Sequence, residues 1–470
     1  MINMQKAPSF IGLETTYLTA NGTHERRIHL DGAASPLASS RALKTIERVL
    51  PHYSSTHSYV HNSARISTNA IAWAHETVLD VLGAASKDYT AIFTGSGTTA
   101  AVNRVARGLS AARPARKIVF VSSMEHHAND LPHRQFGNEV VYLPLTGEGS
   151  QLGIIDIDKF HALCEQYEGS VNYVAISSVS NVTGVKNPIK AICQIAQRHN
   201  IYTVIDGAQS VAHGPTDLSD KGVDFFVFSG HKVYTPGSPG VLIAKKSLLD
   251  GLPGQDLGGG SVETVSYFDY QMLSTYPQKE ESGTPNIVGA IALASVLSEL
   301  GAYGFEQIKK HDEGLTEELI KLLTAIPQLT IYADQSLPRT GAVAFNVAGI
   351  DHGLLAAILN DYYAIAVRNE CFCAHPYVSS LIKESLWELD LSDIPDHQQE
   401  AYINRKRGMV RASISLYNTM EDLRTLVKAI KEIIVNIKTY EPLYTVNSDG
   451  SYQHTDFKLD WRQELGLLGL

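Results

Sequence analysis

Between residues 66 and 245, short apolar segments alternate with segments whose apolar residues recur at helical spacing. The short segments are rich in β-branched and aromatic residues, which is typical of buried strands. Seven strands are predicted, at residues 90–95, 117–123, 138–145, 171–178, 201–207, 224–230 and 240–246, and helices at 98–109 and 187–200 lie among the segments between them. This alternation predicts an α/β fold in which helices cover both faces of a mostly parallel sheet.

The pattern changes near residue 288. A long apolar helix is predicted at 287–304, strands at 341–349 and 409–416, and a last helix from Thr419, because Thr419 and Asp422 have the spacing of an N-terminal cap. A chain of 470 residues is too long for one small core. We therefore predict a large α/β domain at 28–288, a smaller α+β domain formed by 1–27 and 289–438, and a C-terminal extension at 439–470.

Composition argues against several classes of function. The net charge is -10 and no basic run offers a surface to phosphates, so nucleic acid is not expected as a partner. No apolar stretch reaches the length of a membrane span, and the first ten residues lack the layout of a signal peptide. Four cysteines are too few for a disulfide scaffold, so a cytoplasmic location is expected. Cys164 and Cys193 lie in helical segments and are expected to pack in the core.

Polar residues cluster where the predicted strands end, and each has an ordinary explanation on its own. Asp206 fits an N-cap, the glycine-rich segment 95–99 a tight turn, and Asn181 a turn residue. His126 fits a hydrogen-bonded loop residue, and its adjacent-histidine pair is a poor zinc site, so no metal is expected. Lys232 follows an apolar strand, where a lysine either extends its stem to the surface or acts as a nucleophile.

The five clusters acquire another meaning when they are taken together. Ligands collect at the carboxyl ends of the strands of a parallel sheet, so these residues are expected to lie around one site. A turn that binds phosphate, an imidazole, a carboxylate, an amide and a nucleophilic lysine are the components of a pyridoxal-phosphate site. A pyridoxal-phosphate site explains all five clusters together better than five unrelated structural roles at one edge of the sheet.

These residues also carry a resemblance to a known family. The segments are, in order between residues 28 and 435, HLDGAAS, SGTTAAVN, MEHHAND, VSNVTG, VIDGAQSVAH, DFFVFSGHKVY, SGTPN, AVRNECFCAHP and VRASISLYNT. They resemble the class V aminotransferase family of fold type I pyridoxal-phosphate enzymes, and within it the cysteine desulfurase and selenocysteine lyase branch. The resemblance implies a large domain with a seven-stranded, mostly parallel sheet, pyridoxal 5'-phosphate as cofactor, and a homodimer with shared active sites.

The resemblance further implies a role for each matching residue. Lys232 would carry the cofactor and move protons, His126 would stack on its ring, and Asp206 would keep its ring nitrogen protonated. Asn181 and Gln209 would contact the oxygen on the ring. The phosphate would be bound by Thr98, Thr99, Ser229 and His231, and by Thr284 of the neighbouring subunit; the substrate would be bound by Arg411, Arg368 and Ala33.

The loop at 368–376, RNECFCAHP, departs from the family pattern. Cysteine desulfurases carry a nucleophilic cysteine after an Arg-Thr-Gly-His-His-type sequence. Cys373 falls on the position of that cysteine, but residues 369–372 replace the threonine, the glycine and both histidines. Cys373 is therefore a candidate for the catalytic thiol, and buried packing or a redox or transfer role together with Cys371 are the alternatives.

Three hypotheses for function follow. The first is a cysteine desulfurase-like carbon–sulfur lyase that acts on L-cysteine or a related amino acid, giving alanine and a persulfide on Cys373, with a sulfur-acceptor protein as a further partner. The second is a class V transaminase, epimerase or lyase for another amino acid, in which Cys373 is not catalytic. The third, a scaffold or sulfur-carrier partner without activity, is disfavoured because Lys232 and every other implied cofactor contact are present.

Overall fold

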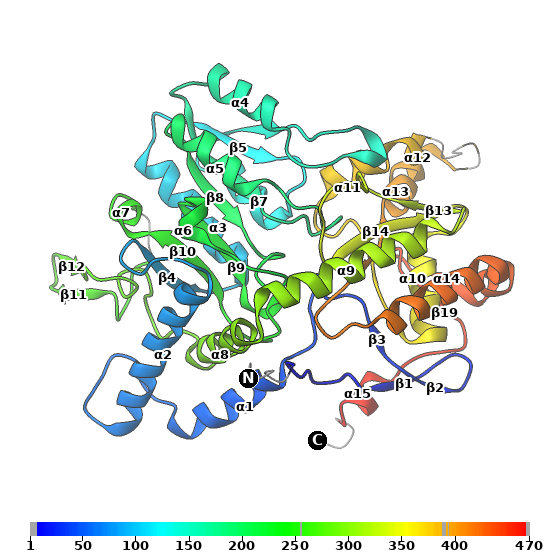
Figure 1. Cartoon of the computed structure of the whole chain (residues 1–470), viewed down its shortest axis with the longest axis horizontal. Helices are drawn as coiled ribbons and strands as arrows, with labels where there is room; N and C mark the ends of the chain where they lie inside the picture. The colour runs from blue at the N-terminus through cyan, green and yellow to red at the C-terminus, as the bar shows by residue number, and fades with distance from the viewer. Residues whose placement is uncertain (1–6, 254–255, 388–391, 393, 467–470) are drawn as a thin grey trace.

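A seven-stranded sheet forms the centre of the protein, as the computed structural model of residues 7–253, 256–387, 392 and 394–466 shows (Figure 1). Its strands in chain order are β4 (Tyr89–Thr94), β5 (Ile118–Ser122), β6 (Glu139–Leu143), β7 (Val171–Ser177), β8 (Tyr202–Asp206), β9 (Phe225–Ser229) and β10 (Gly240–Lys245). Their spatial order is β4-β10-β9-β8-β7-β5-β6, and β10 is antiparallel to both of its neighbours. The seven predicted strands and the mostly parallel sheet are confirmed.

Alternate side chains of the strands pack into cores on opposite faces of this sheet. In β9, Phe225 and Val227 pack with α3 (Gly97–Ala112), whereas Phe226 and Phe228 belong to the core on the other face. Successive side chains of a strand point to opposite faces, which explains this division. The second core also contains residues of α2 (Asn62–Val81), α4 (Ile157–Gln166), α5 (Ile189–Arg198) and α8 (Ile287–Tyr303).

A further apolar core surrounds a four-stranded antiparallel sheet. Its strands, in spatial order, are β13 (Leu329–Ile331), β14 (Ala342–Val347), β17 (Met409–Ser413) and β16 (Arg368–Glu370). The helices that pack here are α9 (Phe305–Thr324), α10 (His352–Tyr363) and α14 (Met420–Tyr440). Helix α14 starts as predicted, because Thr419 and Asp422 form a reciprocal capping box. The predicted limits of the two domains stay a prediction.

The C-terminal extension is described as far as residue 466 and folds against α10. It forms a hairpin of β18 (Tyr444–Val446) and β19 (Tyr452–His454), followed by the short helix α15 (Trp461–Glu464). The Tyr444 hydroxyl donates to Asp361 at 3.0 Å, and His454 hydrogen-bonds the Tyr362 hydroxyl at 3.0 Å. These contacts attach the C-terminal extension to α10, which packs against the four-stranded sheet.

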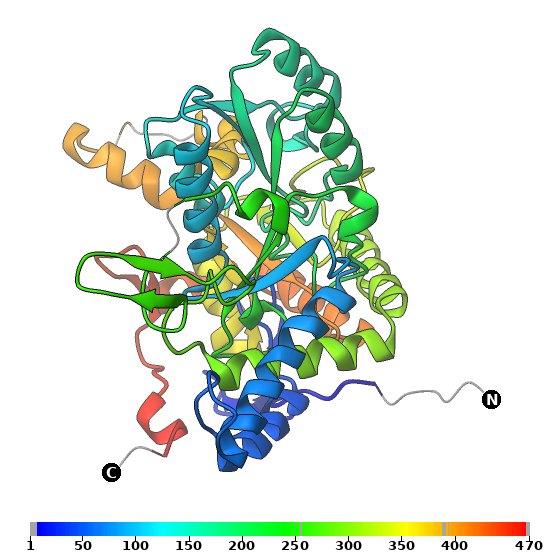
Figure 2. The same ribbon diagram turned by 90° about the vertical axis from the view of Figure 1, so that its left-hand side faces the viewer.

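A second hairpin, β11 (Val262–Val265) and β12 (Tyr270–Met272), projects away from the rest of the protein (Figure 2). Tyr267 and Phe268 at its tip are fully exposed. Among the described residues, no single helix is both long enough and apolar enough to cross a membrane. Helices α8 and α9 meet the two criteria only as a pair, and the pair is bent by 81°.

The remaining elements connect these layers. They are β1 (Thr16–Leu18), β2 (His24–Arg26), β3 (Ile28–His29), α1 (Ser40–Val49), α6 (Leu218–Lys221), α7 (Lys246–Leu249), β15 (Ile365–Ala366), α11 (His375–Leu381), α12 (Lys383–Trp387) and α13 (Asp396–Lys406), with single turns of 3-10 helix at several junctions.

Candidate active site

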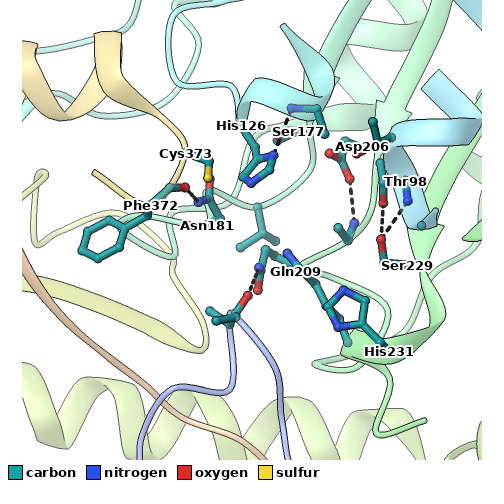
Figure 3. A pocket seen from close by; sticks show the side chains of 18 of the residues that line it. Thr98, His126, Ser177, Asn181, Asp206, Gln209, Ser229, His231, Phe372 and Cys373 are labelled. Atoms are coloured by element: carbon teal, nitrogen blue, oxygen red, sulfur yellow. Dashed lines mark hydrogen bonds between the residues drawn. The ribbon is translucent and has the colours of Figure 1, made fainter. Parts of the chain in front are cut away.

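A cavity of about 460 Å³ lies at the carboxyl ends of β4, β5, β7, β8 and β9 (Figure 3). The predicted site residues that line it are Ala33, Thr98, Thr99, His126, Asn181, Asp206, Gln209, Ser229, His231, Lys232, Arg368, Cys373 and Arg411. Thr284 does not line it and is exposed in the segment before α8. Its contact with a neighbouring subunit stays a prediction, whereas the other thirteen residues are brought together.

Lys232 is delivered to this cavity by a single 3-10 turn, Gly230–Lys232, directly after β9. Burial lowers the pKa of its amine to about 8, and the charge of Asp206 opposes that shift. An amine with a pKa near 8 is partly uncharged at neutral pH, whereas an ordinary surface lysine is almost wholly protonated. Lys232 therefore has the electrostatic environment of a nucleophile.

Asp206 ends β8 and is 5% exposed. Its Oδ1 accepts a hydrogen bond of 2.9 Å from the Ala208 N–H. Burial raises the pKa of this carboxyl, and the hydrogen bond and the Lys232 charge lower it in part. A buried carboxylate is costly unless a cation approaches it, so a positive group that entered the cavity beside Asp206 would be stabilised.

His126 caps the 3-10 turn that follows β5, and its Nδ1 accepts from the Ala128 N–H at 3.0 Å. Because Nδ1 is an acceptor, the neutral ring carries its proton on Nε2. Burial lowers the pKa of His126 to about 4, and the Lys232 charge lowers it further. At neutral pH the imidazole is uncharged, as a ring that stacks on another flat ring should be.

Glu125 is buried next to His126 and fixes the loop that carries it. Its carboxylate accepts hydrogen bonds from Ser122 at the end of β5, from the Ser177 N–H (2.8 Å) and hydroxyl at the end of β7, and from Asn129 Nδ2 (2.7 Å). Burial raises the pKa of Glu125 to about 7, although these hydrogen bonds oppose it. The residue fixes two strand ends and the imidazole-bearing turn relative to one another.

The turn that enters α3 has the form of a phosphate site. Ser229 Oγ accepts from the Thr98 N–H at 2.8 Å and lies 2.9 Å from the Thr98 hydroxyl. Gly97 has φ +58, and a Cβ there would lie 2.6 Å from Ser229 Oγ. No side chain in the described part of the chain caps the helix at Ser96, and of the first-turn N–H groups of α3 only that of Thr99 has no acceptor there, which leaves it available to an anion.

Two arginines from neighbouring strands also line the cavity. Arg368 of β16 and Arg411 of β17 are cross-strand partners. Arg411 is 2% exposed, and it donates to the Asn181 carbonyl (2.7 Å) and to Asp31 (3.1 Å). Burial lowers its pKa to about 10, and Asp31 opposes that shift. The Nε of Arg411 is buried without a hydrogen-bond partner among the described residues. Two facing arginines suit a carboxylate.

The amides of Asn181 and Gln209 are engaged with main-chain carbonyls. Asn181 Nδ2 donates to the Phe372 carbonyl at 2.8 Å, and Gln209 Nε2 donates to the Ala33 carbonyl at 2.7 Å. The two side chains thus hold the segments that carry Cys373 and Ala33 at the cavity. Their predicted contact with a cofactor oxygen stays a prediction.

The two cysteines of the 368–376 loop lie in different environments. Cys373 is exposed and lines the cavity. Cys371 is buried, its Sγ donates to the Arg407 carbonyl at 3.1 Å, and burial raises the pKa of its thiol to about 11. The backbone has positive φ at Glu370 (85°), Phe372 (52°) and Cys373 (55°). Non-glycine residues hold such angles only where the surroundings impose them, as they do at many functional sites.

Sequence reasoning missed four residues of this site: Asp31, Glu125, Ser177 and Phe372. Asp31 pairs with Arg411, and the Phe372 ring lies 4.7 Å from the Arg411 guanidinium carbon. Asp31, Glu125 and Phe372 each stand in a quoted motif, and Ser177 ends a predicted strand. Their position within these motifs was therefore the only sign in the sequence that Asp31, Glu125 and Phe372 belong to the site.

Comparison with known proteins agrees with this geometry. The "Aminotransferase class-V" family model matches residues 28–426. A cysteine desulfurase from Pectobacterium atrosepticum is 32% identical over 86% of this chain and 92% of its own length, and one from Escherichia coli is 31% identical over 86% and 93%.

Solved structures give the same result. The apo structure of a cysteine desulfurase from Thermococcus onnurineus matches with a TM-score of 0.76 and 26% identity, covering 87% of this chain and 95% of that one. A cysteine desulfurase from Escherichia coli matches with a TM-score of 0.72 and 29% identity, covering 87% and 94%. The fold is therefore that of fold type I, and the chain belongs to the class V aminotransferase family of pyridoxal-phosphate enzymes.

Proposed function

We propose that this enzyme is a cysteine desulfurase, which removes the sulfur of L-cysteine, leaves alanine and passes the sulfur to Cys373. The observation that carries the proposal is the position of Cys373. It is an exposed thiol at the cavity that Lys232 and Arg411 also line, whereas Cys371 is buried elsewhere. The names of the relatives support the same reaction.

The cavity fits pyridoxal 5'-phosphate as its cofactor. The raised pKa of Asp206 reflects a buried carboxylate, which a protonated ring nitrogen would stabilise. The turn at Gly97 leaves the Thr99 N–H for the phosphate, and the neutral ring of His126 offers a flat face. When bound, the cofactor supplies an electron sink for negative charge at the α-carbon of the substrate.

The chain's own residues then have distinct tasks. Lys232 Nζ would hold the cofactor covalently, and its free amine, with a pKa near 8, could release and accept a proton at the substrate. Arg411, with an unused Nε, binds the substrate carboxylate beside Arg368. The Cys373 thiolate would attack the sulfur of the substrate, so that a sulfur–sulfur bond forms and the carbon–sulfur bond breaks; the electron pair of the broken bond stays on the substrate carbon, which takes up a proton to become the methyl group of alanine.

Assembly and partners are part of the proposal. The exposed Tyr267 and Phe268 of the β11–β12 hairpin, together with Thr284, suit contact with a second copy of the chain in a homodimer. A sulfur-acceptor protein would take the sulfur from the exposed Cys373. All four cysteines are free thiols, which supports the predicted cytoplasmic location.

The experiment is a sulfide and alanine assay on the purified holoenzyme with L-cysteine and a thiol reductant. We expect equal amounts of sulfide and alanine, loss of sulfide release in Cys373→Ser, and retention of activity in the matched control Cys371→Ser. Unchanged sulfide release in Cys373→Ser would contradict the proposal. So would a screen in which another amino acid, and not cysteine, changes the absorption of the bound cofactor, since that result would favour a class V enzyme of different specificity.

A further inference from the structure

A second cavity, of about 790 Å³, lies apart from the active-site residues. It is framed by the first turn of α5, by α6, by residues 213–216 and by the first half of α9. None of the thirteen active-site residues gathered in the first cavity lines it, although Val179 borders both. The second cavity is large enough for a small organic molecule.

Its wall combines a broad apolar surface with positive charge. The apolar side chains are those of Val179, Pro188, Ile189, Ala191, Ile205, Pro215, Leu218, Val223, Phe226 and Pro338, and the charged ones are Lys186, Lys190, Lys221, Lys309 and Glu313. Four lysines thus face one carboxylate. An occupant of this cavity has to match an apolar wall and any lysine there whose charge is not neutralised.

Lys221 carries the charge that is not neutralised by an ion pair. Lys186 pairs with Glu313, Lys190 pairs with Asp220 at 2.8 Å, and Lys309 lies 4.0 Å from Glu306. The ammonium group of Lys221 makes no hydrogen bond or ion pair with any residue in the described part of the chain. Burial lowers its pKa, with the more distant charges of Asp217 and Asp220 opposing. A half-buried ammonium group of this kind gains from an anion.

The start of α5 adds unused donors at the same place. No side chain in the described ranges of the chain caps this ten-residue helix, and its first turn contains no acidic residue. The N–H groups of Lys190 and Ala191 have no acceptor among the described residues. Thr340, which also lines the cavity and is 3% exposed, has a hydroxyl with no partner among them. Free helix N–H groups, an unpaired lysine and an unused hydroxyl together favour a negative group.

We propose that this cavity is a second ligand site, which binds a small organic anion with a flat apolar body and a carboxylate, phosphate or sulfonate group. The body would lie against Ile189 and Phe226, and the anionic group would lie between the start of α5 and Lys221. The site is independent of the proposed desulfurase reaction, so either can fail without the other.

The probe for this site is anilinonaphthalene sulfonate, whose fluorescence rises in an apolar environment, titrated into the holoenzyme. Its uncharged analogue, N-phenyl-naphthylamine, is the control ligand. We expect Lys221→Met to raise the Kd of the sulfonate about tenfold, because one charged contact is lost, and to leave the Kd of the uncharged analogue unchanged. Ala191→Trp, which fills the cavity from α5, should abolish binding of both.

A matched control variant is Lys159→Met, which removes an exposed lysine of α4 outside the cavity. It should bind both probes as the unmodified enzyme does. The proposal is overturned if the sulfonate binds equally well to the unmodified enzyme, Lys221→Met and Ala191→Trp, because the probe then lies elsewhere. Absence of saturable binding overturns it too. If Ala191→Trp does not fold, Lys221→Met alone tests the proposal: the Kd of the sulfonate must rise relative to the Kd of the uncharged analogue.

Discussion

Replacing Gly97 with alanine tests the phosphate-binding turn. Gly97 has φ +58, an angle that costs an alanine about 1 kcal/mol. The new Cβ would lie 2.6 Å from Ser229 Oγ and 3.4 Å from Ser229 Cβ, so the serine side chain has to move. That movement breaks the two contacts of Ser229 Oγ with Thr98, at 2.8 and 2.9 Å.

The magnitude follows from these losses. Each broken hydrogen bond costs about 1 kcal/mol, so with the backbone strain the folded state loses about 3 kcal/mol. The proposed contact of the Ser229 hydroxyl with the cofactor phosphate would be lost as well, and a lost contact to a charged group weakens binding by about tenfold or more. We therefore expect Gly97→Ala to lower both the stability of the apoenzyme and its affinity for pyridoxal phosphate.

The assay compares Gly97→Ala with Gly95→Ala from the same turn. A Cβ at Gly95 would lie an unstrained 3.9 Å from Ala100 Cβ, and Gly95 has an ordinary φ. Denaturant unfolding of each apoenzyme and titration with pyridoxal phosphate, followed by absorbance, give the two quantities. Equal stability and equal affinity of the two variants would refute the reasoning.

The remaining predictions concern the lysine, the cysteine pair and the last helix. Covalent capture of pyridoxal phosphate by Lys232, trapped with borohydride in the apoenzyme, should accelerate with rising pH around a midpoint near 8, because only the uncharged amine attacks; a midpoint near that of free lysine would contradict this. Iodoacetamide should alkylate exposed Cys373 well before Cys371, whose buried thiol has a pKa of about 11, and mass spectrometry that finds the reverse order would show the loop to be misplaced. Thr419→Ala should lower the free energy of unfolding by about 1 kcal/mol, while Thr419→Ser retains the cap; equal loss in both would exclude the capping box as the cause.

The strands and the strand-end residues were predictable because they depend on local patterns. Alternating helix-like and strand-like segments predict a parallel sheet, and a parallel sheet gathers its strand ends at one edge. The order of the strands was not predictable in this way. The antiparallel β10 lies between β4 and β9, and such pairing depends on contacts between segments far apart in the chain.

The site was predictable in its composition and less so in its contacts. Cys371 and Cys373 differ little in the sequence, yet one is buried and the other lies at the cavity. The positive φ angles at Phe372 and Cys373 make that difference, and no glycine marks them in the sequence. The pairing of Arg411 with Asp31 joins residues 380 positions apart, which local patterns do not reveal.

The most direct test of the central claim is to locate the sulfur after a single turnover. The holoenzyme is incubated with L-cysteine in the absence of reductant, digested, and the peptide with Cys371 and Cys373 is fragmented in a mass spectrometer. The account predicts one added sulfur atom on Cys373, none on Cys371, and one alanine for each modified chain. Alanine formed without an added sulfur on Cys373, or formed equally fast by Cys373→Ser, would contradict it.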